Sequence, residues 1–168
     1  MRNSGLPAVV FLSVFLCMGG VGHAEQHDRL VPLFVDLAGW QAQPVQGMSL
    51  LTAQMKMISA NRNYSQSDKN LTVSILVNSG PVLDSDLQEF SSDNETFTIH
   101  SRQIDGFWVK STHTKENRSG QMLLYLDYNQ EATGLLIAEY AKMDEEEVLQ
   151  VIKSMDLKKL KKVVSGML

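Results

Sequence analysis

The feature that most limits the fold is a period-two pattern between residues 71 and 77. Apolar residues occupy every second position there, namely Leu71, Val73, Ile75 and Val77. Successive side chains on a strand point to opposite faces, so this pattern predicts a strand with one buried face. Residues 55–64 alternate in the same way, and a polar segment, residues 65–70, joins the two runs. Two alternating runs joined by a polar turn predict an antiparallel hairpin.

Further elements follow a break at residues 78–81. Alternation predicts four more strands, over residues 96–103, 107–113, 121–128 and 133–140. Apolar residues at helical spacing predict a short helix over residues 82–90. A last helix is predicted to begin at Asp144, whose carboxylate we expect to accept from the first-turn amides, with Glu147 in the reciprocal position. The inward side of this helix would carry Val148, Val151, Ile152 and Met155.

These elements predict an α+β fold in the order ββαββββα. Strands joined by tight turns are antiparallel neighbours, and a sheet with one apolar face needs a cover. We therefore expect an antiparallel sheet of about six strands, covered by a C-terminal helix and one short helix. The apolar side of residues 71–77 would lie beneath the C-terminal helix. Residues 49–168 would form this single domain, and residues 25–48 an irregular lead-in.

Residues 1–24 have the pattern of a secretory signal peptide. Arg2 supplies a positive start, Leu6–Val21 is apolar or small, and Gly22 and Ala24 offer small residues where a signal peptidase reads the chain. The apolar run is too short for a spanning helix, which needs about 20 residues. We expect cleavage after Ala24 and a periplasmic or secreted mature chain without a transmembrane segment.

The single cysteine, Cys17, lies inside the apolar run. Cleavage would leave a mature chain with no disulfide and no cysteine-based metal site. The alternative is a lipoprotein signal with Cys17 as the lipidated residue, but such signals want a small residue where this chain has Leu16. A secreted domain without disulfides must be stabilised by its core, and a domain of about 150 residues buries roughly 68–70% of its unfolded surface.

The charge of the chain disfavours nucleic acid and anionic membranes as partners. The net charge is −4, and removing Arg2 with the signal peptide makes it −5. Nucleic acids and anionic membranes select a basic surface. The lysine-rich end, residues 157–164, is a candidate anchor on an anionic surface or a partner. Favourable positive charge at a helix C-terminus is the simpler interpretation.

Several short motifs resemble a group of small exported bacterial proteins. In that group an L-P-x-L-x-G-W-like opening precedes an A-x-R-x-Y strand, and an I/M-D-L-x-x-L ending closes a helix. The matching segments here are Leu33–Trp40, Ala60–Tyr64, Ile104–Gly106 and Met155–Leu160, with Phe34 where a proline is commoner. The group has no assigned activity or ligand. The resemblance therefore implies export and a fold, and it transfers no site.

The sequence carries no catalytic or cofactor motif. It has no G-x-S-x-G elbow, phosphate-binding glycine loop or H-E-x-x-H motif, so we expect no catalytic residue, no metal and no cofactor. One alternative stays open, because His100 and His113 lie on neighbouring predicted strands. They could form the site of a metal-binding protein or a hydrolytic enzyme. Ordinary strand-surface histidines are the simpler interpretation.

Two tryptophans provide the candidate ligand-binding residues. Each indole combines a large apolar face with one N–H donor, which suits binding as well as packing. We expect a binding surface where Trp40, from the lead-in, approaches the sheet near Trp108; the competing interpretation is that Trp40 plugs the edge of the core. Trp108 alternates with Phe107, so one of the two should lie on the second face of the sheet.

The sequence thus favours an exported, non-catalytic binding or envelope accessory protein. Its partner would be an unknown envelope protein or a small ligand. If the second face of the sheet is open, it exposes an apolar patch that would serve as the contact surface.

Overall fold

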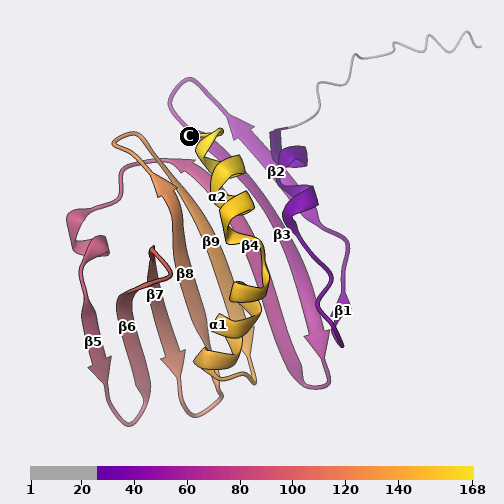
Figure 1. The fold of residues 1–168 in the computed structure, drawn as a ribbon, viewed down its shortest axis with the longest axis vertical. Helices are drawn as coiled ribbons and strands as arrows, with labels where there is room; N and C mark the ends of the chain where they lie inside the picture. The colour runs from indigo at the N-terminus through magenta and orange to yellow at the C-terminus, as the bar shows by residue number, and fades with distance from the viewer. Residues whose placement is uncertain (1–25) are drawn as a thin grey trace, which may run out of the picture.

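A nine-stranded antiparallel sheet organises residues 26–168, the part of the chain that this computed structural model describes (Figure 1). The strand order is β1-β3-β4-β9-β8-β7-β6-β5, and β2 pairs with β3 beside β1. The strands are β1 (Gln41–Ala42), β2 (Gln46–Leu51), β3 (Lys56–Gln66), β4 (Lys69–Ser79), β5 (Phe90–Asp93), β6 (Phe97–Ile104), β7 (Phe107–Thr114), β8 (Ser119–Tyr128) and β9 (Ala132–Ala141). The predicted class, α+β with an antiparallel sheet, is confirmed.

The predicted number and order of strands are wrong at the edges of the sheet. All six predicted strands are present as β3, β4 and β6 to β9, and the structure adds β1, β2 and β5. The predicted helix over residues 82–90 is only one short 3-10 turn, η3 (Asp84–Leu87), after which Phe90 starts β5. Phe90 pairs with Ser101 on β6, so sheet pairing replaces the last turn of the predicted helix.

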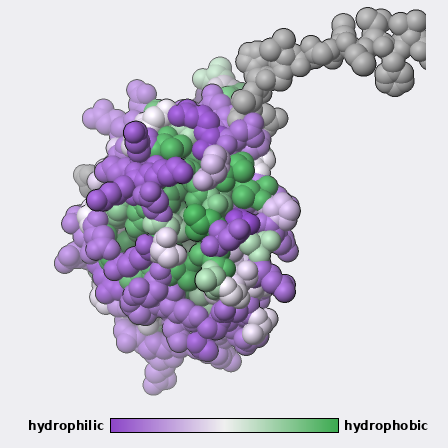
Figure 2. All heavy atoms as spheres, turned by 45° about the vertical axis from the view of Figure 1, so that its right-hand side comes forward, coloured by the Kyte–Doolittle hydropathy of each residue, from purple (hydrophilic) through white to green (hydrophobic). Residues whose placement is uncertain are grey.

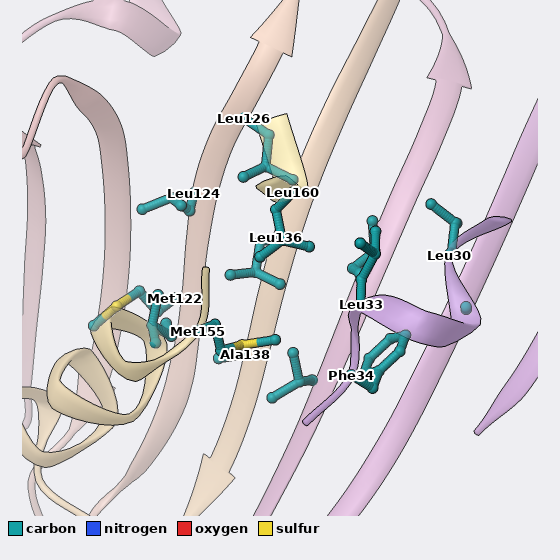
Figure 3. Packing of buried hydrophobic residues seen from close by; sticks show 14 of the residues in the cluster. Leu30, Leu33, Phe34, Met122, Leu124, Leu126, Leu136, Ala138, Met155 and Leu160 are labelled. Atoms are coloured by element: carbon teal, nitrogen blue, oxygen red, sulfur yellow. The ribbon is translucent and has the colours of Figure 1, made fainter. Parts of the chain in front are cut away.

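The predicted lead-in contributes to the sheet. It begins with two 3-10 helices, η1 (Gln26–Arg29) and η2 (Val31–Leu33), and then forms β1 and the start of β2. Leu30, Leu33 and Phe34 are buried against the rest of the core, as Figure 3 shows. The signal peptide and its cleavage after Ala24 concern residues outside the described part of the chain.

One face of the sheet, the covered face, carries the core. Leu71, Val73, Ile75 and Val77 of β4 are buried, and their cross-strand partners on β9 are Tyr140, Ala138, Leu136 and Gly134. The C-terminal helices lie over this face (Figure 1) and bury Val148, Ile152 and Met155 in the same cluster. The prediction that Leu71–Val77 bury alternate side chains on one face, beneath the C-terminal helical segment, is therefore confirmed. Apolar atoms within a hydrophilic rim fill the middle of the surface in Figure 2.

The predicted C-terminal helix is two helices, α1 (Glu145–Ser154) and α2 (Leu157–Ser165). Met155 has an extended backbone, with φ −79° and ψ 149°, and it ends α1. The carboxylate of Asp156 then accepts a hydrogen bond from the amide of Lys159 at 2.9 Å. This is the contact of an N-cap residue, so Asp156 starts a new helix.

The predicted capping contacts of Asp144 are wrong. Asp144 is the N-cap of α1, but its side chain accepts no hydrogen bond from the helix. Its two carboxylate oxygens lie 2.9 and 2.8 Å from the guanidinium of Arg118. Glu147 pairs with Lys69 on β4 instead of reaching back to the N-cap. Asp144 therefore joins the helix to the β7–β8 turn and Glu147 joins it to β4, because charged partners from these segments are within reach.

The opposite side of the sheet, the open face, has no helix over its centre among the described elements. Its residues on β4, such as Thr72, Ser74 and Leu76, are half-buried where their neighbours on the covered face are fully buried. The connection between β4 and β5, residues 80–89, borders this face. None of the described helices has the length and apolar composition to cross a membrane.

Candidate ligand-binding site

Side chains on the open face form rows that cross the strands. Residues paired in register lie side by side on one face, with Cβ atoms about 4.5–5.5 Å apart. The first row is apolar from β4 to β7, at Leu76, Leu135, Tyr125 and Trp108, and it continues on β6 with Gln103. The second row changes character along its length, and its members are Ser74, Ile137, Leu123, Lys110, Ser101 and Phe90. In this second row, the polar side chains of Lys110 and Ser101 lie between the apolar Leu123 and Phe90.

A pocket of about 320 Å³ lies over the second row, where β5 to β8 meet. Phe90, Ile99 and Leu123 supply apolar walls. The polar residues around it are Ser101, Lys110, Thr112 and Gln121, together with His100 and Ser111, which the register assigns to the covered face. Apolar walls with a few converging polar groups are the usual composition of a small-ligand site.

The hydroxyl of Ser101 is the most informative group in this pocket. The residue is 4% exposed, and its Oγ has no hydrogen-bond partner among the described residues. Leaving a buried hydroxyl unpaired costs about 1–3 kcal/mol. Lys110 lies directly opposite Ser101 in the β6–β7 register. The pocket therefore holds an unused hydrogen-bonding group next to a cation.

The cation of Lys110 already holds a carboxylate. Its Nζ lies 2.6 Å from Oδ1 of Asp86, which the connection between β4 and β5 brings to the open face. The hydrogen bond and the charge of Lys110 hold the pKa of the Asp86 carboxyl below its usual range. Both side chains are only partly exposed. Of this ion pair, Lys110 lines the pocket and Asp86 does not.

A separate hollow of about 180 Å³ lies along the apolar row and shares no lining residue with the pocket. Tyr125 and Leu135 line it, together with Asp86 from the connection. The side-chain oxygen of Asn78, another lining residue, is buried and has no partner in the described part of the chain. Burial and the charge of Asp86 raise the pKa of the Tyr125 hydroxyl, which therefore stays a neutral donor. The open face thus contains two hollows, each lined by a residue with an unpaired polar oxygen.

The structure does not bring Trp40 and Trp108 together. Trp40 packs against the core, just before β1 at one end of the sheet. Trp108 lies on β7, five strand positions away in the order of the sheet. Neighbouring strands are about 4.8 Å apart, so the two indoles are separated by roughly 24 Å. Of the alternating neighbours Phe107 and Trp108, Trp108 lies on the open face and Phe107 on the covered face.

The structure places His100 and His113 on the covered face as diagonal neighbours. His100 pairs with Ser111, two residues before His113 on β7. Nδ1 of His100 lies 3.1 Å from the hydroxyl of Ser91, and Nδ1 of His113 lies 3.1 Å from that of Tyr140. The described residues contain no group of three or more His, Cys, Asp or Glu side chains that could hold a metal ion. The alternative metal site therefore lacks a third ligand within that part of the chain.

The histidines adjoin a polar contact between the sheet and α1. The buried Ser111 donates to Oε1 of Glu145 at 2.7 Å, and Arg102 lies 4.0 Å from the same carboxylate. Burial, together with the charges of Glu145 and Asp144, raises the pKa of Tyr140, so this hydroxyl is neutral at physiological pH. These contacts attach the start of α1 to β6 and β7.

Sequence reasoning missed Ser101, Lys110 and Asp86. A signal for the first two was present, since Asp105-Gly106 is a typical two-residue hairpin turn that sets the strand register. Both residues have a positive φ, 51° and 82°, and Ile104 pairs with Phe107 across them. Counting back from this pair places Ser101 opposite Lys110. Asp86 comes from a distant connection, for which the sequence carries no such signal.

No protein-family model matches the chain, and no curated protein or solved structure shows significant similarity to it.

Proposed function

We propose that this protein is an exported, non-catalytic binding protein that holds a small ligand on the open face of its sheet. The observation that carries the proposal is the buried, unpartnered hydroxyl of Ser101 in a pocket with apolar walls. Buried polar groups are normally hydrogen-bonded, and a bound molecule is one way to satisfy such a group. Apolar side chains left half-exposed beside it provide contact area for the rest of the ligand.

Export rests on the sequence. The signal-peptide pattern of residues 1–24 and the resemblance to small exported bacterial proteins both support a periplasmic or secreted location. Fractionation of cells that express the full chain tests this part. We expect the processed protein in the periplasmic or secreted fraction, with Glu25 as its first residue. Recovery of the unprocessed chain in the cytoplasm would contradict export.

Binding on the open face can be tested with anilinonaphthalene sulfonate, a fluorescent dye that combines an apolar body with a negative charge. Leu123 and Val163 are both half-buried, but Leu123 lines the pocket and Val163 lies on α2. We expect Leu123→Ser to remove most of the dye fluorescence and Val163→Ser to preserve it. Thermal denaturation of each variant shows whether the fold is intact.

The control variant also separates the two apolar surfaces of the molecule. The covered face exposes its own apolar atoms, as Figure 2 shows, and these could attract the dye. If Val163→Ser reduced the fluorescence and Leu123→Ser did not, the dye would bind on the covered face. That result would contradict the proposed site.

A further inference from the structure

We propose that the ligand is an amphipathic monocarboxylate whose headgroup displaces Asp86 from Lys110. This inference depends on the proposed function, because it assigns a ligand class to the same pocket. The headgroup would accept hydrogen bonds from Lys110 and Ser101, and the apolar chain would lie against Phe90, Ile99 and Leu123.

The ion pair with Asp86 shows that the ammonium of Lys110 can bind a carboxylate. The carboxylate of Asp86 sits 2.6 Å from Nζ of Lys110, so the geometry around this ammonium already suits a carboxylate. Asp86 comes from the connection between β4 and β5 and is tied to η3, where its other oxygen accepts from the amide of Leu83 at 3.3 Å. A ligand carboxylate could take the same position over Lys110 while Asp86 keeps its contact with Leu83.

The Ser101 hydroxyl gives a ligand carboxylate a partner that Asp86 does not use. Lys110 and Ser101 are directly opposite on neighbouring strands. At this spacing one carboxylate can accept from both side chains, one bond at each oxygen. Exchange of Asp86 for a ligand thus preserves the charge pairing of Lys110 and adds a hydrogen bond to a buried hydroxyl. The second bond gives the ligand an advantage over the chain's own carboxylate.

The single cation favours a carboxylate over a phosphate. The cationic partner that the pocket offers is Lys110, and a phosphate group near neutral pH carries more charge and more acceptor oxygens than a carboxylate. Phosphate sites typically use several donors or a guanidinium fork. A headgroup with one negative charge and two oxygens matches one ammonium and one hydroxyl.

The remaining walls define the other half of the ligand. Leu123 and Phe90 flank the polar pair within the same row, and Ile99 lines the pocket beside them. Phe90 belongs to the short edge strand β5 and is 56% exposed, so its ring is available for further contact. A pocket of about 320 Å³ is at the small end of ligand sites. We therefore expect an unbranched chain of medium length and use decanoate as the probe.

The test compares decanoate with decanol, which has the same chain and no charge, by titration calorimetry on the mature protein. We expect decanoate to bind about tenfold or more tightly, because a hydrogen bond to a charged group contributes at least that factor. Lys110→Met should remove this preference, since it keeps an apolar stem and loses the charge. Lys153→Met is the matched control, because Lys153 also pairs with an aspartate, Asp105 at 3.3 Å, outside the pocket.

Two further variants test the exchange itself. Asp86→Asn removes the competing charge and should tighten decanoate binding several-fold with little effect on decanol. Ser101→Ala should weaken decanoate binding, and Ser101→Thr, which keeps the hydroxyl, should restore part of it. Weaker binding of decanoate to Asp86→Asn would overturn the exchange mechanism, because Asp86 would then hold the ligand. Melting curves of all variants identify any that fail to fold, and Lys110→Gln replaces Lys110→Met in that case.

The outcomes distinguish this inference from the function on which it rests. Equal binding of decanoate and decanol on the open face, unchanged in Lys110→Met, would support a binding protein and overturn the carboxylate assignment. No binding of either compound, together with dye fluorescence that Leu123→Ser does not alter, would overturn both.

Discussion

Val164 on α2 packs directly over Gly134 on β9, so closely that a Cβ atom at position 134 would overlap the Cγ1 atom of Val164. The close approach results from packing, because the backbone of Gly134 needs no positive φ. Gly134 is in the β4–β9 register opposite the buried Val77. The absence of a side chain at Gly134 therefore allows α2 to pack closely against the sheet.

Gly134→Ala should destabilise the protein by about 1–3 kcal/mol, the usual cost of overpacking a core. Chemical denaturation measures this change. Gly166→Ala is the matched control, because a Cβ there meets only ordinary contacts of 3.5 Å or more. Adding Val164→Ala to Gly134→Ala should recover part of the loss. Equal stability of Gly134→Ala and the parent protein would contradict the close packing of α2.

Val73→Asp should destabilise the protein by several kcal/mol. Val73 is buried on the covered face, so the substitution places a carboxylate without a partner in the core. Ser74→Asp is the control one residue away, since Ser74 is half-buried on the open face. Thermal unfolding of the two variants should therefore differ strongly. A parent-like melting temperature for Val73→Asp, together with a strong loss for Ser74→Asp, would mean that the two faces of β4 are assigned in reverse.

Trp40→Ala should lower stability and leave ligand binding unchanged. Trp40 packs against the core from the segment before β1, and removing a buried tryptophan costs about 3–5 kcal/mol. We expect a loss somewhat below that range, because the side chain is only partly buried. Decanoate titrations of the variant, at a temperature where it is folded, should match those of the parent. A normal melting temperature with lost binding would restore Trp40 as a ligand contact.

Arg118→Ala should raise the pKa of Asp144. The bidentate contact with Arg118 holds this carboxyl below its usual range, mainly through hydrogen bonding. Without it the pKa should return toward the ordinary aspartate value of about 3.9. Carbon NMR of the side-chain carboxyl over a pH titration measures the shift. An unchanged pKa in the variant would contradict the pairing.

Stability should fall at alkaline pH partly because of Tyr140. Burial is the main cause of its raised pKa in the folded protein, and the unfolded chain has the ordinary value of about 10. The contribution of Tyr140 is therefore complete below about pH 10 and declines as the pH rises further. Free energies of unfolding for the parent and Tyr140→Phe should approach each other above that pH. Parallel pH profiles for the two proteins would contradict this account.

The central strands could be predicted because one of their faces is buried. In β4 every second residue is buried, and the sequence shows that difference as an alternation of apolar and polar residues. The three edge strands could not be predicted in this way. Gln46–Leu51 and Phe90–Asp93 have no buried side chains, and they join the sheet mainly by backbone pairing, with exposed side-chain hydrogen bonds such as that of Ser91 with His100. Such segments carry no period-two signal.

The candidate site was predictable only in part. The open apolar surface follows from the alternation of Phe107 and Trp108, and the Asp105-Gly106 turn determines the Ser101–Lys110 pair. Asp86 reaches Lys110 from 24 positions away in the sequence. Local patterns cannot place such a contact, since it depends on how the connection between β4 and β5 runs past the sheet. The same reason applies to Asp144, whose partner Arg118 is contributed by another strand connection.

Binding at the open face is tested most directly by an NMR titration of the isotope-labelled protein with decanoate. We expect the largest amide shifts at residues around the pocket, namely Ile99, Ser101, Lys110, Thr112 and Leu123. Amides of α2 and of the segment around Trp40 should remain nearly unchanged. Shifts confined to α2 and the segment around Trp40, or no shifts at decanoate concentrations in the millimolar range, would contradict binding of this ligand at the open face.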